Sequence, residues 1–195
     1  MRKIYFTFFI ILISTLTFAQ LRSSVLASGT YNNHNYEIRV STSKISWTQA
    51  KNECQQLGGY LVTITSANEN NFVLSLAVQA ATSDTWGPWI GFTDENTEGV
   101  WEWVTGEAVV YTNWWAQEPD NEWGGQDYGW MLNRHGSDNG KWSDAGDPNT
   151  TAGGPTYSMI CEYSADCFNV DTDCDGCIDD FELLNAIDRW ADCGR

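Results

Sequence analysis

The chain has 195 residues, of which 42% are hydrophobic and 14% aromatic, and its formal net charge at pH 7 is −16. A charge this negative repels the phosphate backbone, so the composition argues against nucleic acid as a partner. Part of the acidity is concentrated in loops, which points to cations as partners.

The first 19 residues are predicted to be a secretory signal peptide. Arg2 and Lys3 precede an apolar run at residues 4–18, and Ala19 is a small residue at the expected cleavage position. The run is shorter than the roughly 20 apolar residues that a membrane-spanning helix needs, and no second such run follows. Losing Arg2 and Lys3 with the leader takes the formal charge from −16 to −18. We therefore expect a secreted, extracellular protein with no membrane span, and a short leader ending at Ala19-Gln20 suits a bacterium.

Residues 20–29 are expected to form a linker, and the alternation of His34–Val40 predicts an opening strand. Ser46 and Gln49 form a Ser-x-x-Gln capping box, which marks the start of a first helix. This helix is expected to extend to Gly58, with a buried face formed by Trp47, Ala50, Cys54 and Leu57.

A second helix is predicted to begin at Ser66, because Glu69 follows three residues later in the same capping pattern. From Trp86 onward, short apolar segments alternate with Gly, Asn, Asp and Pro, which is typical of strands and turns. The expected strands are Trp89–Phe92, Val100–Val104, Val109–Tyr111, Tyr128–Leu132, Lys141–Ser143 and Tyr157–Tyr163. Two helices followed by such strands indicate an α+β domain.

Two connections, at residues 112–125 and 145–155, are long for a compact domain, and loops of this length often carry function. The first contains Glu118-Pro119-Asp120. Calcium binds six to eight oxygen ligands, and a cis bond before Pro119 would turn the Glu118 and Asp120 side chains toward one point. This loop is therefore a candidate calcium site.

Four short features occur in a fixed order along the chain: Trp89-Ile90-Gly91, Glu118-Pro119-Asp120, Trp142-Ser143-Asp144 and Cys161. In this order and at this spacing they resemble the C-type lectin-like domain, and the resemblance covers residues 30–163. It implies an α+β fold with two helices, mixed short strands and long loops. It also implies a disulfide between Cys54 and Cys161 and, in sugar-binding members, a carbohydrate held through a bound calcium ion.

The resemblance implies five calcium ligands, which are Glu118, Asp120, Gln126, Ser143 and Asp144. Glu118 and Asp120 flank a proline that is cis in the family. Gln126 stands where members usually have glutamate, and Ser143 and Asp144 stand where they usually have asparagine and aspartate. Because Gln126 lacks a charge and Ser143 offers only a hydroxyl, we expect looser calcium binding than a full ligand set would give.

The ligand expected at this ion is a sugar with a vicinal diol. The implied sugar-binding residues are Glu118, Asp120, Trp123, Gln126 and Asp144. Glu-Pro-Asp is a hybrid of the Glu-Pro-Asn of mannose-type members and the Gln-Pro-Asp of galactose-type members. Trp123 resembles the aromatic residue that packs on galactose, which favours the galactose type. Asp127 would compensate for Gln126 if the loop shifted by one residue.

Most of the tryptophans are expected to be core residues. The core candidates are Trp89, Trp101, Trp103 and Trp142, because they lie on expected strands or at the packed positions of the family. Trp114, Trp115 and Trp123 lie in the long loop, and among them Trp123 is the first candidate for contact with a ligand.

A second calcium site is predicted in the tail, at residues 164–195. Residues 171–182 match the twelve-residue EF-hand loop, with Gly176 at the sharp turn. The expected ligands are Asp171, Asp173, Asp175, the carbonyl of Cys177, Asp179 and Glu182. With one loop and no clear preceding helix, the tail resembles half of a dockerin module, which suggests docking to an extracellular assembly. The tail has four cysteines, Cys167, Cys174, Cys177 and Cys193, which are expected to form disulfides. Four cysteines can pair in three ways, and the sequence leaves all three open.

The sequence therefore predicts a secreted, calcium-dependent carbohydrate-binding protein. The alternative is an extracellular adhesion or structural protein that uses the same fold for calcium-independent contacts with other proteins, as Gln126 and Ser143 would favour. An enzyme is not expected, because the two histidines, His34 and His135, are far apart and no catalytic motif is present.

Overall fold

The computed structural model of the chain describes residues 23–80, 87–122, 124–133, 138–146 and 156–164. The expected signal peptide at residues 1–19 and the expected EF-hand-like tail at residues 164–195 lie outside these residues, apart from Ser164. Within the described residues, no helix is long and apolar enough to cross a membrane.

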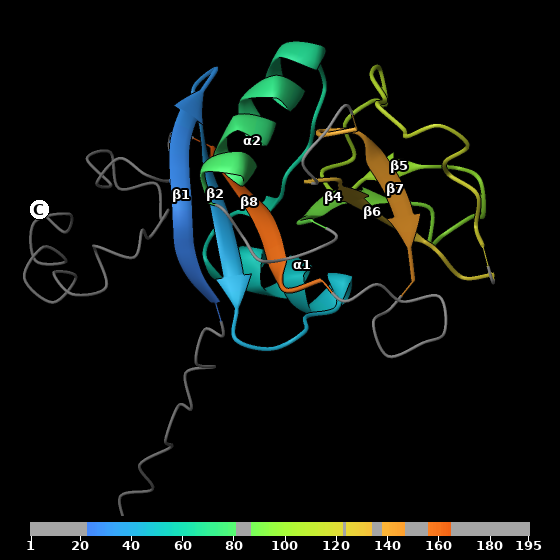
Figure 1. Cartoon of the computed structure of the whole chain (residues 1–195), viewed down its shortest axis with the longest axis horizontal. Helices are drawn as coiled ribbons and strands as arrows, with labels where there is room; N and C mark the ends of the chain where they lie inside the picture. The colour runs from blue at the N-terminus through green and yellow to red at the C-terminus, as the bar shows by residue number, and fades with distance from the viewer. Residues whose placement is uncertain (1–22, 81–86, 123, 134–137, 147–155, 165–195) are drawn as a thin grey trace, which may run out of the picture.

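Ten elements follow one another along the described chain. They are β1 (Ser23–Tyr31), β2 (His34–Ser41), α1 (Trp47–Gln56), β3 (Tyr60–Leu61), α2 (Ala67–Gln79), β4 (Trp89–Thr93), β5 (Glu102–Trp103), β6 (Tyr128–Met131), β7 (Trp142–Ala145) and β8 (Ser158–Ser164). The main path of the sheet runs β1-β2-β8-β4-β6-β7, with β3 added on β8 and β5 on β4. Because β8 pairs antiparallel with β2 and parallel with β4, the last strand joins the N-terminal hairpin to the strands that carry the long loops (Figure 1).

Helix α1 begins at the predicted capping box. The Ser46 hydroxyl accepts a hydrogen bond from the Gln49 backbone N–H at 3.1 Å, and the Gln49 side chain accepts one from the Ser46 N–H at 3.1 Å. The helix ends where Gly58 adopts a left-handed φ of 81°, a conformation that favours glycine. The first helix is therefore confirmed, with Trp47, Ala50 and Cys54 on its buried face.

Helix α2 is also confirmed, but only half of its expected capping pattern is present. The Ser66 hydroxyl accepts from the Glu69 N–H at 3.2 Å. The Glu69 carboxylate accepts from the Thr65 N–H at 2.7 Å and from the Tyr36 hydroxyl at 2.8 Å. Glu69 thus connects the start of the helix to strand β2.

The expected linker at residues 20–29 is wrong from Ser23 onward, because Ser23–Tyr31 forms β1 and pairs along its length with β2. Asn32 and Asn33 join the two strands with φ values of 46° and 65°. Positive φ at both central residues is the requirement of a type I′ hairpin turn, which asparagine tolerates. This Asn-Asn pair was the signal for a hairpin.

Two other strand predictions need correction. The strand expected at Val100–Val104 is reduced to β5, and Val109–Tyr111 forms no strand. Val100 and Val110 are 59% and 74% exposed, so these apolar residues belong to loops and do not face the core. The short strand β3 was not predicted.

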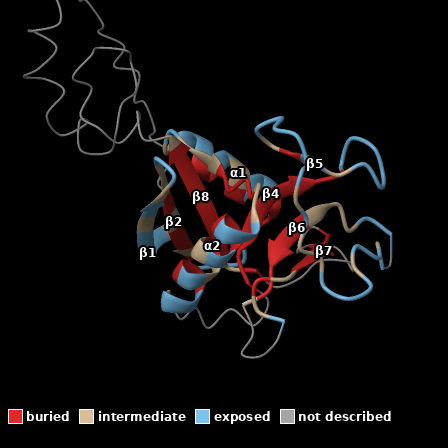
Figure 2. Ribbon diagram, turned by 90° about the horizontal axis from the view of Figure 1, so that it is seen from above, coloured by how far each residue is buried: buried red, intermediate tan, exposed pale blue. Residues whose placement is uncertain are grey.

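The glycine of Trp89-Ile90-Gly91 has a steric reason. A Cβ on Gly91 would lie 2.4 Å from the Leu61 carbonyl oxygen and 2.8 Å from a Val104 methyl group. Strand β4 can therefore approach its neighbours this closely only with glycine at position 91. All five residues of β4 are buried, and β8 and β6 are buried beside it (Figure 2).

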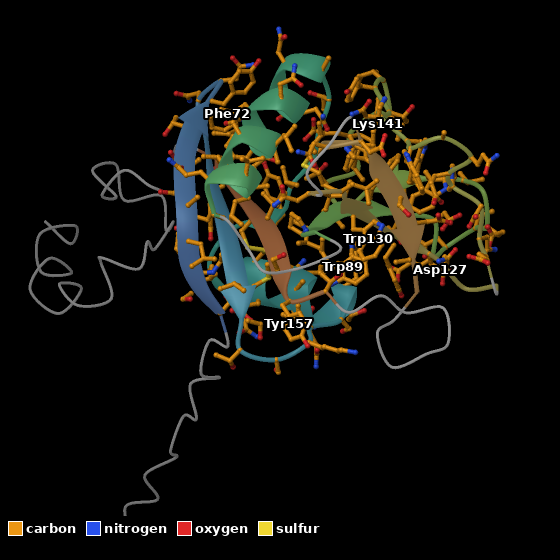
Figure 3. All side chains as sticks on the ribbon, viewed as in Figure 1. Phe72, Trp89, Asp127, Trp130, Lys141 and Tyr157 are labelled. Carbon is orange, nitrogen blue, oxygen red and sulfur yellow. A yellow bond between two sulfur atoms is a disulfide. The ribbon has the colours of Figure 1, made fainter. Side chains whose placement is uncertain are left out.

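Two apolar clusters fill the interior. One packs α2 against the sheet, and the other surrounds α1 and contains Trp89 and Trp130, whose ring centroids lie 6.1 Å apart (Figure 3). The second cluster also contains the disulfide between Cys54 of α1 and Cys161 of β8, which joins residues 107 positions apart.

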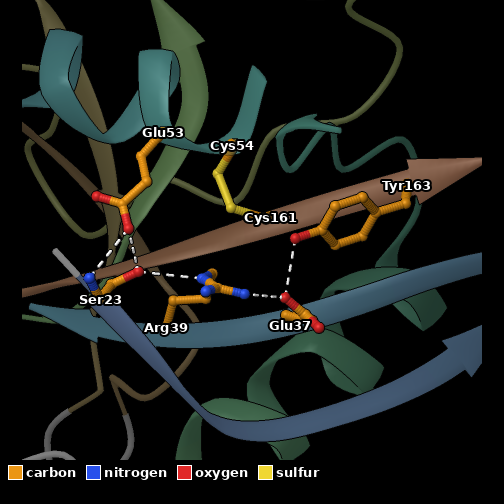
Figure 4. The surroundings of a disulfide bond; sticks show 7 residues. All are labelled: Ser23, Glu37, Arg39, Glu53, Cys54, Cys161 and Tyr163. Atoms are coloured by element: carbon orange, nitrogen blue, oxygen red, sulfur yellow. Dashed lines mark hydrogen bonds and ion pairs between the residues drawn. A yellow bond between two sulfur atoms is a disulfide. The ribbon is translucent and has the colours of Figure 1, made fainter. Parts of the chain in front are cut away.

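A polar network lies beside this disulfide (Figure 4). The buried Arg39 donates to the Ser23 hydroxyl at 3.0 Å and to Glu37 at 2.5 Å, and Ser23 donates its backbone N–H to Glu53 of α1 at 3.0 Å. Tyr163 of β8 donates to the same Glu37 at 2.8 Å. The network ties the N-terminal hairpin to α1 and β8.

Candidate metal centre

The long loop between β5 and β6 runs beside the start of β7. Asn113 accepts a hydrogen bond from the Trp142 N–H at 2.9 Å, and the Trp115 N–H donates to the Trp142 carbonyl at 2.7 Å. Trp114 forms a parallel bridge with Trp142 between these two bonds. Both segments therefore run in the same direction, one toward Glu118 and the other toward Asp144.

The loop then turns and meets the end of β7. The Glu118–Pro119 peptide bond is cis. The Asp144 carboxylate accepts from the Asp120 N–H at 3.3 Å and from the Asn121 N–H at 2.9 Å. Because Asp144 is only 2% exposed, it anchors the loop from inside the domain.

Three carboxylates meet at this point. One oxygen each from Glu118, Asp120 and Asp144 lies within 4.8 Å of the other two. None of the ion pairs found among the described residues reaches them. The cluster therefore concentrates negative charge with no basic side chain paired to it in that part of the chain.

Glu118 is the residue most affected by this concentration. Burial raises its pKa to about 8, and a hydrogen bond with Asp144 and the charges of Asp144 and Asp120 contribute in the same direction, while a hydrogen bond from Ser143 opposes them. Near neutral pH, the Glu118 carboxyl therefore keeps a proton unless a cation compensates its charge.

The structure brings the other two expected ligands to the same loop system. Gln126 donates its N–H to the Asn121 side chain at 3.0 Å, and its own side-chain oxygen is buried without a hydrogen-bond partner. Ser143 is 7% exposed and donates to the backbone carbonyl of Asp144 at 3.2 Å. Trp123, the expected sugar-packing residue, lies outside the described residues.

These residues fit a hard cation such as calcium. Oε2 of Glu118 and Oε1 of Gln126 are both buried, and neither has a hydrogen-bond donor within the described part of the chain. Leaving a buried oxygen without a donor is unfavourable, and carboxylate and amide oxygens are the ligands that calcium prefers. A cation would satisfy these atoms and the three carboxylates together.

Additional acidic residues in the β4–β5 loop were missed by the sequence analysis. The Asp94 carboxylate is buried, with one oxygen accepting from the Gly99 N–H at 2.8 Å and the other without a partner. Glu98 accepts from the Asn121 side chain at 2.6 Å. The signal was the Asp-x-x-x-Glu spacing directly after the buried strand β4.

Asp127, which the sequence analysis considered as a substitute for Gln126, lies next to this acidic group. Its backbone carbonyl accepts from the Asp94 N–H at 3.2 Å, and its side chain lies at the loop end of β6 (Figure 3). Burial raises the pKa of Asp127, and the charges of Asp94, Glu95 and Asp144 add to the shift.

Comparison with known proteins gives a consistent match. Residues 43–163 match the lectin C-type domain. An α-N-acetylgalactosamine-specific lectin of Patiria pectinifera is 34% identical over 139 residues, which cover 69% of this chain and 77% of that protein. A perlucin-like protein of Mytilus galloprovincialis is 39% identical over 77 residues, 39% of this chain and about half (49%) of that protein. Both relatives come from animals and give no support to the bacterial source expected from the leader.

A solved structure agrees at the level of the fold. The C-type carbohydrate-recognition domain of cow CD23, determined in the presence of a GlcNAc2Man3 oligosaccharide, is 27% identical, with a TM-score of 0.58 over 71% of this chain and 94% of that one. The α+β fold with two helices and a mixed sheet is therefore shared with a carbohydrate-recognition domain.

Proposed function

This chain belongs to the C-type lectin domain family, a non-enzymatic carbohydrate-binding class, and from this premise we propose that it is a secreted lectin that binds a sugar through calcium. The observation that carries the proposal is the meeting of Glu118, Asp120 and Asp144 within 4.8 Å of one another. The side-chain oxygens of Glu118 and Gln126 that are buried without a hydrogen-bond partner among the described residues support it further.

Each residue has a distinct role in the proposed site. Glu118, Asp120 and Asp144 would supply the charged ligands, and Gln126 and Ser143 the neutral ones. A bound calcium ion would offer coordination positions that two neighbouring sugar hydroxyls could occupy in place of water. The carboxylates then accept hydrogen bonds from those hydroxyls, and charge-assisted bonds of this kind orient the diol. Asp144 fixes the geometry, because it already holds the loop through the Asp120 and Asn121 N–H groups.

The proposed sugar is of the galactose type. Asp120 gives the loop the Glu-Pro-Asp sequence, which shares its aspartate with the galactose-type members. The relative from Patiria pectinifera is described as specific for α-N-acetylgalactosamine, a sugar of that type, which supports this choice. Trp123 stays a proposed contact with the sugar.

An extracellular adhesion protein that does not use calcium at this loop is the second candidate. It is favoured by Ser143, which offers only a hydroxyl oxygen where the family usually has an amide, and by the missing charge at Gln126. In this case the fold would contact another protein directly, and chelation would leave that contact unchanged.

The proposal also includes secretion of the chain and a second calcium site in its tail. Residues 1–19 would be removed as a signal peptide, and residues 171–182 would hold a calcium ion that orders the tail for docking to an extracellular partner. The proposed tail ligands are Asp171, Asp173, Asp175, Cys177, Asp179 and Glu182.

A glycan-array assay of the full chain, with and without chelator, tests the proposed function. We expect binding to galactose-type glycans that disappears with chelator and with Asp144→Ala. Because the tail would also respond to chelator, the variant identifies the loop as the site. Glu107→Gln is the matched control, since it removes one exposed charge away from the cluster and should bind as wild type. Binding by folded Asp144→Ala at the wild-type level would reject the calcium mechanism and favour the adhesion protein.

A further inference from the structure

Trp115 is unusual among the tryptophans of the described part of the chain. It is 38% exposed, and the structure places every other described tryptophan in the buried or half-buried class. Those other residues are Trp47, Trp89, Trp101, Trp103, Trp114, Trp130 and Trp142. An indole presents a large, rigid apolar surface, and tryptophan is enriched where proteins contact other molecules.

The backbone of Trp115 is fixed next to the carboxylate cluster. Its N–H donates to the Trp142 carbonyl at 2.7 Å, two positions before Asp144, and its carbonyl accepts from the Glu118 N–H at 3.1 Å. The second bond closes a four-residue turn, and Gln117 at its third position has a φ of 80°, as a type II turn requires. In such a turn, the first and fourth Cα atoms lie within about 7 Å. Trp115 and Glu118 are therefore neighbours in space.

The direction of the ring follows from its neighbour. Trp114 packs into the aromatic core, with its ring centroid 4.6 Å from that of Trp101, 5.6 Å from that of Phe92 and 6.1 Å from that of Trp142. Successive side chains of an extended, paired segment point to opposite faces. The Trp115 ring accordingly points away from the core, in agreement with its exposure of 38%.

We propose that Trp115 is a specificity-determining residue whose indole packs against the apolar C–H face of the saccharide held at the Glu118–Asp144 site. The inference rests on the proposed function and adds a residue to it. A cation and carboxylates can engage only the hydroxyl rim of a pyranose, so the carbon-bound hydrogens of the ring need an apolar surface nearby. Trp115 supplies that surface from a backbone fixed by two hydrogen bonds, and this fixed position lowers the ordering cost of binding.

The test is titration calorimetry of the full chain in saturating calcium, with methyl β-galactoside and methyl α-mannoside as probes. Trp115→Ala should weaken the binding of the preferred probe by about two- to tenfold, the range given by one aromatic packing contact. Trp115→Phe should retain most of the affinity, because it keeps an aromatic face. Val110→Ala is the matched control: it shortens a 74%-exposed apolar residue on the same loop and should leave the affinity unchanged.

The outcomes separate this inference from the proposed function. If Asp144→Ala abolishes binding but folded Trp115→Ala binds both probes as wild type, Trp115 does not touch the sugar and only this inference is overturned. If Trp115→Ala changes self-association in sedimentation without changing probe affinity, the ring contacts a second copy of the chain, which also overturns it. If the wild-type chain binds no saccharide in calcium, the proposed function fails and this inference fails with it.

Discussion

Glu118 is the residue at which the chemistry of the site is most visible. The residue ends a turn and precedes a cis proline. Its carboxyl lies within 4.8 Å of the carboxylates of Asp120 and Asp144. The pKa of about 8 means that the cation-free protein keeps this group neutral at a pH where an ordinary glutamate is ionised. Proton and cation therefore compete for the same oxygen atoms.

This competition predicts how Glu118→Gln changes stability with pH. In chelator, the folded-state pKa of about 8 exceeds the ordinary 4.5, so ionisation destabilises the wild-type fold progressively as pH rises through that window. The amide that replaces the carboxyl in this variant carries no charge at any pH. We expect the midpoint temperature of Glu118→Gln to equal that of wild type near pH 4 and to exceed it increasingly up to about pH 8.

Scanning calorimetry across this pH range, with chelator and with calcium, provides the measurement. With calcium, the midpoint temperature of Glu118→Gln should fall below that of wild type, because the variant has lost a charged ligand. Glu107→Gln controls for the loss of an exposed charge elsewhere. If the variant were less stable than wild type at pH 8 in chelator, burial and the acidic neighbours would not raise the pKa of Glu118 in the folded protein.

At the scale of the elements, helix α2 and strand β7 are joined by one buried amide. Asn70 is 2% exposed, accepts from the Trp142 indole N–H at 2.8 Å and donates to the Gly140 carbonyl at 3.1 Å. Trp142 directly precedes Ser143 and Asp144. The helix thus holds the strand from which two of the proposed calcium ligands project.

Asn70→Ala should therefore destabilise the domain. The substitution leaves the indole N–H of Trp142 buried without an acceptor, and an unsatisfied buried donor costs about 1–3 kcal/mol. Urea unfolding followed by fluorescence measures the difference. Asn71→Ala, at an exposed position of the same helix, is the control and should change the free energy of unfolding by less than about 0.5 kcal/mol. Equal effects of the two substitutions would show that the Asn70 bridge contributes nothing specific.

The elements also show which structural features could be predicted from the sequence. Helix α1 could be predicted because its signals, the Ser46–Gln49 cap and Gly58, act within a few residues. Strand β1 was missed because its sequence has little alternation, and the one local signal for its pairing with β2 was the two-residue turn at Asn32-Asn33. The strand expected at Val109–Tyr111 is absent, since Val109 and Val110 are exposed in a loop and Tyr111 packs against the core without strand pairing.

The candidate site was predictable to a similar extent. The motifs gave Glu118, Asp120 and Asp144, and these three residues do meet in space. The acidic residue Glu98 was missed because its contact with Asn121 depends on how two loops far apart in sequence pack together. The motifs behind the resemblance cover both the Glu118–Asp120 loop and Asp144 of β7, but they do not include Glu98, whose contact with that loop depends on the fold.

At the scale of the whole molecule, the Cys54–Cys161 disulfide joins the two halves of the fold. It connects α1 to β8, the strand that also bridges the N-terminal hairpin and the strands bearing the long loops. Because 107 positions separate the two cysteines, the bond restricts most of the described domain in its unfolded state. The surrounding network of Arg39, Glu37 and Ser23 depends on the same contact between hairpin, helix and last strand (Figure 4).

Replacing both cysteines by alanine should lower the free energy of unfolding by about 3–5 kcal/mol, since the chain entropy released by opening a loop grows with its length. The double variant is preferred to chemical reduction because it leaves the cysteines of the tail unchanged. Denaturant unfolding in calcium gives the value, and the midpoint should fall by more than it does for Asn70→Ala. The buried Ala50→Gly change on α1 is the control for loss of packing and helix propensity alone, worth about 1 kcal/mol. A double variant that loses no more than this control would mean that the core around α1 and β8, with its polar network, holds the two halves together without the covalent bond.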